Sequence, residues 1–139
     1  MNLKWMTLPS EANYLAPDTS EIRLLPEMQG GGLCHCTLPP FSTSRAIVHH
    51  TVEEIWYVIS GSGQMWRKLE DQETVVSLYP GVGITIPPKT KFQFRNIGDQ
   101  PLCILLSTMP PWPKTEKEKK EEVDDKVEGF WKEVSKKEP

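Results

Sequence analysis

The stretch that decides the fold reads Val48-His-His-Thr-Val-Glu-Glu-Ile-Trp-Tyr-Val-Ile-Ser-Gly-Ser-Gly63. Imidazoles and carboxylates stand directly before an apolar run that ends in a glycine-rich turn. A short apolar run bounded by glycine is typical of a β-strand that enters a hairpin. Histidine and glutamate gathered at one end of a β-sandwich are the residues from which metal sites are built. This stretch therefore predicts both a strand and the place of a functional site.

The same alternation of short apolar runs and turn residues extends on both sides of this stretch. Clusters of Gly, Pro, Asn and Asp separate the runs. Many short strands with no helical stripe among them indicate an all-β, antiparallel sandwich or barrel. The expected strands are Ile22–Leu25, Leu33–Leu38, Ala46–His49, Glu54–Ser60, Gln64–Leu69, Thr74–Tyr79, Gly83–Ile86, Phe92–Arg95 and Leu102–Ser107.

The two ends of the chain differ from this central part. Residues 1–21 are rich in turn residues and predict an extended lead-in. Residues 22–113 form the expected barrel. Residues 114–139 are dominated by Lys, Glu and Asp and predict a charged tail.

The conformation of the tail has two interpretations. Val123, Val127, Phe130 and Val134 fall at helical spacing, which predicts a C-terminal helix with one apolar face. Gly129 in the middle of that helix lowers its stability by about 1 kcal/mol relative to alanine. The alternative is an extended segment that docks only Phe130 and the adjacent Trp131.

Composition excludes several classes of protein. The chain has 139 residues, 37% of them hydrophobic and 25% charged, which fits one globular domain. The net charge is −3 with both signs interspersed, so we expect no nucleic-acid partner. No apolar run suits a secretion signal or a membrane span, and we expect no membrane partner. Three cysteines without such a signal favour reduced thiols and a cytoplasmic location.

Two segments resemble the motifs of the cupins, the small double-stranded β-helix or jelly-roll barrel proteins. The first is the spacing from Glu54 to Gly61, which matches the Glu and Gly of the first cupin motif. The second is the stretch from Pro87 to Asn96, which corresponds to the second motif. The resemblance spans about residues 22–108. It implies a cupin barrel, a homodimer, and a divalent metal held by three histidines and one glutamate.

The chain departs from the cupin motifs at the metal ligands. Either Val48 or Ile47 occupies the position of the first histidine, depending on whether His50 or His49 supplies the second. Phe92 stands at the position of the third histidine, and Lys89 replaces the glycine of the second motif. Two of the four ligands that the resemblance implies are therefore of another residue type. We expect a divalent metal (Zn, Fe, Mn or Ni) to be weakly held or absent.

The remaining candidate ligands and catalytic groups are few. Glu54, His49 and His50 are the candidates for both roles, and His35 is a further candidate metal ligand. Successive strand residues point to opposite faces, so only one of the adjacent histidines faces the barrel unless a bulge intervenes. By the same argument His35 points away from the face shared by Cys34 and Cys36.

Aromatic residues on the expected strands predict a ligand pocket. With Glu54 facing inward, Trp56 follows it to the same side. After the glycine turn, alternation along the next strand allows two cases: either Gln64 and Trp66 face inward, or Met65 and Arg67 do. An inward Phe92 brings Phe94 with it. We therefore expect a small-molecule pocket lined by Trp56, Gln64, Trp66, Phe92 and Phe94, although the same rings could instead fill the barrel completely.

These observations favour a small-molecule-binding cupin with an incomplete or atypical metal site, whose ligand and activity the sequence does not name. One alternative is a metal-dependent cupin enzyme of the dioxygenase or isomerase class. A second is a structural or interaction module in which the charged tail recruits a partner. We expect chelator treatment to separate the enzyme from the binding protein, and deletion of the tail to separate the module from both.

Overall fold

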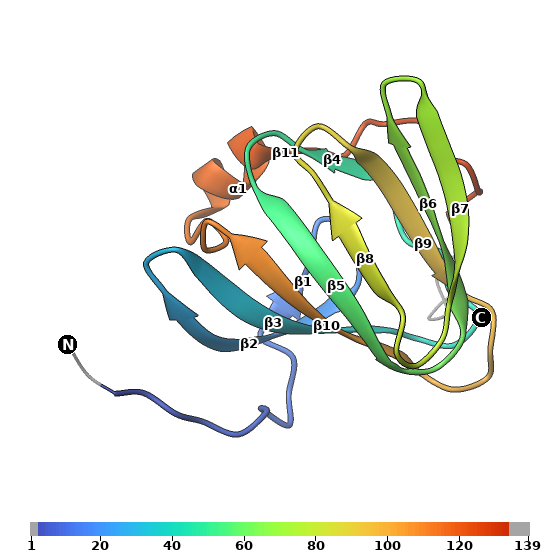
Figure 1. Ribbon diagram of the computed structural model, residues 1–139. Coiled ribbons are helices and arrows are strands. Elements are labelled where there is room, and N and C mark those ends of the chain that lie inside the picture. Colours follow the sequence, from blue (N-terminus) through green and yellow to red (C-terminus); the bar gives the residue numbers. More distant parts are fainter. Residues whose placement is uncertain (1–2, 134–139) are drawn as a thin grey trace.

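Two antiparallel sheets face each other in the computed structural model, which describes residues 3–133 (Figure 1). One sheet has six strands in the order β1-β2-β3-β10-β5-β8, and the other has five in the order β11-β4-β9-β6-β7. This arrangement confirms the all-β, antiparallel barrel that the sequence predicts.

All strands but two are three to eight residues long, as alternating apolar and polar residues in short runs predict. The six-stranded sheet consists of β1 (Tyr14–Leu15), β2 (Glu21–Met28), β3 (Gly31–Leu38), β5 (Glu53–Ser60), β8 (Gly83–Ile86) and β10 (Leu102–Met109). The five-stranded sheet consists of β4 (Ile47–His49), β6 (Gly63–Leu69), β7 (Gln72–Leu78), β9 (Lys91–Asn96) and β11 (Val123–Asp124).

A tight glycine connection carries the chain from β5 in one sheet to β6 in the other. Gly61 has a φ of 96°, a left-handed conformation that glycine adopts without strain. A Cβ on Gly63 would lie 2.2 Å from the carbonyl oxygen of Arg95, so β9 can approach β6 closely only because a glycine stands there. This turn fixes which residues of β6 face the barrel interior.

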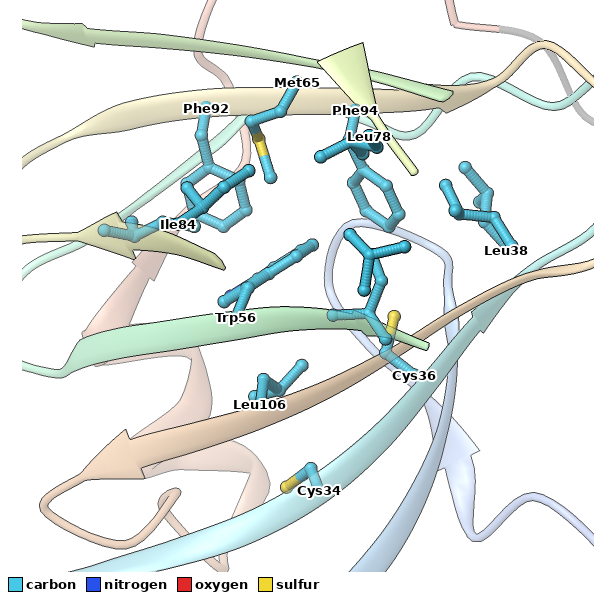
Figure 2. Close-up of a cluster of buried hydrophobic side chains, with 14 of the residues drawn as sticks. Cys34, Cys36, Leu38, Trp56, Met65, Leu78, Ile84, Phe92, Phe94 and Leu106 are labelled. Carbon is cyan, nitrogen blue, oxygen red and sulfur yellow. The ribbon is translucent and has the colours of Figure 1, made fainter. Parts of the chain in front are cut away.

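Much of the barrel interior is packed with side chains from both sheets (Figure 2). Trp56 of β5 meets Phe94 of β9 edge to face, with ring centroids 5.0 Å apart. Met65 of β6 fills the space beside these rings and has no exposed surface. Aromatic pairs of this kind contribute about 0.5–1.5 kcal/mol beyond the burial of their area. This part of the interior is therefore a close-packed core.

Both ends of the chain add a short strand to a sheet. At the N-terminus β1 pairs with β2, and at the C-terminus β11 pairs with β4. The predicted division of the chain at residues 22 and 113 stays a prediction. No helix within residues 3–133 has the length and apolar character to cross a membrane.

The tail does not form the predicted helix over Val123 to Val134. Its helix is α1 (Glu116–Glu122), which begins at Thr115 with a reciprocal capping arrangement with Glu118. After β11 the chain is extended, as the alternative interpretation expects. Backbone pairing with β4 competes with helix formation here, and Gly129 packs against Gln93, where a Cβ would lie 2.7 Å from the amide oxygen. Val134 lies outside the described residues.

The extended tail covers the outer face of the five-stranded sheet. The buried Gln93 amide donates to the carbonyl oxygen of Trp131 at 2.8 Å and accepts from its N–H at 2.8 Å. The Arg95 guanidinium lies 4.4 Å from the centroid of the Trp131 ring. Phe130 stacks on Trp66 with an interplanar angle of 20°. The tail thus docks both aromatic residues on this face.

Candidate functional site at the mouth of the barrel

His49 and Glu54 meet at the mouth of the barrel, which is the end of the sandwich closed by Tyr14 and Trp112. His49 is the last residue of β4 and is 3% exposed, whereas the following His50 is exposed. Glu54 is the second residue of β5 and is 6% exposed. The His49 Nε2 lies 3.2 Å from the Glu54 Oε2. The structure thus answers which of the two histidines faces inward.

The other oxygen of Glu54 is held by Trp56, whose indole Nε1 donates to Glu54 Oε1 at 2.7 Å. Both residues lie on the inward face of β5, as strand alternation predicts. Each carboxylate oxygen therefore has a defined partner, and hydrogen bonds to an ionised group are among the stronger ones in proteins. Glu54 and His49 form a buried polar pair next to the aromatic rings of Trp56 and Phe92.

The electrostatic state of His49 follows from this pairing. Burial lowers the pKa of His49, but the charge of Glu54 and its hydrogen bond outweigh burial and hold the pKa above the usual 6.5. Asp18 and Glu122 contribute in the same direction. The pairing with Glu54 therefore favours the protonated form of His49 more than in an isolated imidazole.

Asp18 is a member of the site that sequence reasoning missed. It is 4% exposed, and its Oδ1 accepts from the backbone N–H of Ser20 at 3.0 Å and from the Ser20 hydroxyl at 2.6 Å. Burial raises the pKa of Asp18, and the hydrogen bonds from Ser20 offset part of the rise. The Asp-x-Ser spacing signals a local turn, but only the tertiary fold brings that turn to the barrel mouth.

A pocket of about 40 Å³, here called the mouth pocket, lies between these groups. Its volume is roughly three times what a single ordered water needs. The polar part of its lining includes Tyr14, Asp18, Ser20, His49, Glu54 and Thr108. The apolar part includes Ile22, Ile47, Trp56, Phe92, Leu106 and Trp112. The pocket therefore has aromatic walls with a compact set of polar groups, which is the composition of a small-molecule site.

Three residues that line the mouth pocket each carry a buried polar atom with no hydrogen-bond partner within the described residues. The atoms are the Nδ1 of His49, the Oγ1 of Thr108 and the Nε1 of Trp112. The rings of His49 and Trp112 meet edge to face with centroids 5.0 Å apart. Buried polar groups in proteins are satisfied as a rule. Three unpartnered groups around one pocket therefore point to a ligand or water that completes them.

The predicted pocket residues divide into three groups. Trp56 and Phe92 line the mouth pocket, with Phe92 5.4 Å from the ring of His49. Phe94 faces inward but belongs to the packed core below the pocket. Gln64 and Trp66 lie on the outer face of the sheet, and their assignment to the pocket needs correction. Met65 takes the inward position, because the turn at Gly61 and Gly63 sets the parity of β6.

The outward residues of β6 have partners of their own. The Gln64 Oε1 accepts from the Nε of Arg95 at 2.8 Å and from its Nη2 at 2.5 Å. Trp66 donates from Nε1 to Glu73 at 2.7 Å and is covered by Phe130 of the tail. Trp66 is thus buried on the outer face of the sheet, where Phe130 of the tail covers it.

His35, the further candidate metal ligand, lies apart from the mouth pocket. His35 faces the other side of β3, where burial and the neighbouring Arg23 lower its pKa. Cys34 and Cys36 face inward and line the pocket, and burial raises the pKa of the Cys34 thiol to about 11. Thiols in such surroundings are weak nucleophiles and weak metal ligands at neutral pH.

The donor set does not fit the metal that the resemblance implies. With His49 inward, Ile47 occupies the first histidine position and Phe92 the third, and both line the pocket. Within residues 3–133 no group of three His, Cys, Asp or Glu side chains is placed to hold a metal ion. Catalytic zinc takes about three protein ligands and structural zinc about four. The expectation of a weak or absent metal stays a prediction.

The charged tail supports the loop between His49 and Glu54. Glu122, at the end of α1, accepts from the backbone N–H groups of Thr51 and Val52 at 2.5 and 2.8 Å and from the Thr51 hydroxyl at 2.6 Å. Its own carbonyl oxygen accepts from the N–H of His50 at 2.8 Å. Burial raises the pKa of Glu122, but these hydrogen bonds hold it below its usual value. Sequence reasoning placed this residue only in the charged tail.

Comparison with known proteins agrees with the fold. Residues 34–108, more than half of the chain, match the cupin domain family. An uncharacterised protein of Methanocaldococcus jannaschii is 36% identical over 104 residues, which are 71% of this chain and 80% of the relative. The chain belongs to the cupin family.

Two solved structures show the same fold at low sequence identity. The cupin domain of CENP-C from Drosophila melanogaster has a TM-score of 0.58 and 15% identity, covering 64% of this chain and 68% of that one. An uncharacterised conserved protein with a double-stranded β-helix domain from Klebsiella pneumoniae has a TM-score of 0.57 and 17% identity, covering 76% of this chain and 83% of that one. At these identities the likeness concerns the fold alone.

Proposed function

We propose that this cupin binds a small organic molecule in the mouth pocket, with its polar end toward His49, Thr108 and Trp112. The observation that carries the proposal is the set of unpartnered buried atoms on these three residues. Leaving a buried polar group unpaired costs about 1–3 kcal/mol, so a ligand that pairs them gains binding energy from the same source.

The walls supply the rest of the binding energy. Trp56 and Phe92 meet at 81° with centroids 5.8 Å apart and present an edge-to-face pair to the pocket. Burial of apolar ligand surface against such rings contributes roughly 25 cal/mol per Å². A volume of about 40 Å³ takes a head group of a few atoms, and the remainder of the molecule extends past Tyr14 and Trp112 toward solvent.

Protein-observed NMR with a fragment library tests this proposal. The library holds neutral, anionic and cationic molecules of up to about ten non-hydrogen atoms, for which a favourable ligand efficiency still gives millimolar or better affinity. The reporters are the indole N–H signals of Trp56 and Trp112, and the exposed Trp5 serves as internal control. We expect several fragments to shift both pocket reporters and to leave Trp5 unchanged.

A variant whose mouth pocket is filled by a larger side chain shows whether the fragments bind in that pocket. Ala16 lines the mouth pocket, so Ala16→Phe fills its rim. Val75→Phe on the exposed face of β7 adds the same ring away from the pocket. We expect the first variant to lose fragment binding and the second to keep it. Fragments that shift neither pocket indole, or that bind equally well to Ala16→Phe, would refute the proposal.

A further inference from the structure

We propose that the outer face of the five-stranded sheet is a peptide-binding site, which recognises an extended Gly-Phe-Trp segment of a partner protein. In this structure the chain's own tail covers the site with Gly129, Phe130 and Trp131. The site lies on the outside of the barrel, so it is a second site and does not depend on ligand binding in the mouth pocket.

A buried side-chain amide recognises the main chain of the segment. Gln93 is 1% exposed, and its amide donates to the carbonyl oxygen of Trp131 and accepts from the Trp131 N–H, both at 2.8 Å. The same amide donates to the carbonyl oxygen of Ser44 at 2.9 Å. The pair of bonds to Trp131 resembles one step of a β-ladder, from which an added strand gains affinity. Gln93 therefore selects an extended backbone, which many sequences can supply.

A glycine is required two residues before this main-chain contact. A Cβ on Gly129 would lie 2.7 Å from the Oε1 of Gln93 and 3.0 Å from its Nε2. The amide could make room for a Cβ only by moving away from its partners on Trp131 and Ser44. Because those bonds are buried, their loss is costly. The site therefore discriminates against segments with a side chain at this position.

The two aromatic rings of the segment have different partners on the sheet. Phe130 stacks on Trp66 with ring centroids 6.1 Å apart. Trp131 lies against Arg95, whose guanidinium carbon is 4.4 Å from the ring centroid. Tryptophan is the best aromatic partner for a cation, and stacked rings add to the energy of buried area. These contacts account for a Phe followed by a Trp after the glycine.

The side chains that form the site are held by the barrel, not by the tail. The indole of Trp66 donates to Glu73 at 2.7 Å. The guanidinium of Arg95 donates twice to the Oε1 of Gln64, at 2.5 and 2.8 Å. A site whose side chains are already fixed loses less conformational entropy when it binds. The site therefore keeps its shape when the tail leaves it.

The tail reaches the site through a segment that stands away from the barrel. Residues 125–128 are mostly exposed, and a hollow of about 320 Å³ is lined on one side by this segment and on the other by Arg45, Ala46 and Gln93. Phe130 is 52% exposed although it is docked. Segments with few buried contacts open at a low free energy. The docked segment can therefore leave and return while the barrel stays folded.

A synthetic peptide tests the proposal on the full chain. The double variant Phe130→Ala/Trp131→Ala keeps the side chains of the site and removes the rings that cover them. The probe is the unlabelled hexapeptide of residues 128–133, Glu-Gly-Phe-Trp-Lys-Glu, and the reporter is the indole N–H signal of Trp66. A short linker gives the tethered tail an effective concentration of about a millimolar, so we expect wild type to bind the peptide at least about tenfold more weakly than the double variant.

Two control peptides test whether the sequence is recognised. One carries Gly129→Ala, and the other has the same six residues in reverse order. Both keep the two aromatic residues and the net charge of the probe. We expect each to bind the double variant at least about tenfold more weakly than the probe. The indole signal of Trp56 in the barrel interior shows that the variant is folded and should not shift.

The proposal is overturned if the probe at millimolar concentration leaves Trp66 unshifted, or if the reversed peptide binds as tightly. Equal binding to wild type and to the double variant would place the peptide elsewhere and would also overturn it. Wild-type dimers that the probe dissociates would make a second copy the occupant and refute the assignment to a partner protein. Phe130→Ala alone, which removes only the half-exposed ring, provides the same comparison if the double variant does not fold.

Discussion

Replacement of Glu122 by alanine should destabilise the protein although the residue belongs to a charged tail. The change removes one acceptor from the hydroxyl of Thr51 and from the N–H groups of Thr51 and Val52. Thr51 is exposed, so water can replace part of the loss, whereas Val52 is 1% exposed and its N–H stays unpaired. One buried unpaired donor and the lost charge-assisted bonds together are worth about 3 kcal/mol.

Thermal and urea unfolding measure this effect. For a domain of this size about 3 kcal/mol corresponds to a fall in Tm of about 10 °C. Glu121→Ala is the matched control, because the Glu121 carboxylate is 66% exposed and, within residues 3–133, its one ion pair is with Lys117 at 3.9 Å on the helix surface. Such surface pairs contribute about 0–1 kcal/mol.

The same variant has a readout in the functional site. The charge of Glu122 is one of those that raise the pKa of His49, so Glu122→Ala and Glu122→Gln should both lower that pKa in an NMR titration. Glu122→Gln keeps a side-chain acceptor and should recover part of the lost stability. The reasoning would be refuted if Glu122→Ala had the same Tm as Glu121→Ala and kept the wild-type pKa of His49.

Three further predictions concern the His49–Glu54 pair, the missing metal ligand at position 92 and the docking of the tail. Because Glu54 raises the pKa of His49 above 6.5, the stabilisation from the charged pair is complete below pH 6.5 and is lost as pH rises through the raised value. The free energies of unfolding of wild type and His49→Gln in urea should therefore differ more at pH 6 than at pH 9. A difference that does not change with pH would contradict this. Phe92→His places a second imidazole in the mouth pocket beside His49, at the position of the third cupin histidine, and should raise zinc affinity at least about tenfold by calorimetry. Unchanged affinity would show that Phe92 is not the missing ligand position. Trp131→Ala should lower the free energy of unfolding by about 1–2 kcal/mol through loss of the contact with Arg95, whereas equal stability would mean that the tail is not docked in solution.

Strand alternation was sufficient to predict the inward face of β5. The residues Glu54 and Trp56 lie two apart on one strand, so a local period places both on the same side. The choice between His49 and His50 could not be made in this way. It depends on the register in which Ile47 pairs with Phe92 of β9, and that register is set by contacts distant in the sequence.

The wrong and the missed site residues also depend on contacts between residues distant in the sequence. The outward orientation of Gln64 and Trp66 follows from the length of the turn before β6, which the alternation within β6 does not contain. The tail supplies a cover for Trp66 that makes an outward residue look like a core residue. Asp18 and Glu122 lie outside the cupin motifs, and only the closed fold brings them to His49 and Glu54.

A crystal structure of the protein soaked with a fragment that shifts the indole signals of Trp56 and Trp112 tests the central claim most directly. The account predicts density for the fragment in the mouth pocket, with a polar atom within hydrogen-bond distance of His49 Nδ1, Thr108 Oγ1 or Trp112 Nε1. A metal ion held there by three side chains at about 2.0–2.3 Å, or a pocket closed by its own side chains, would contradict it.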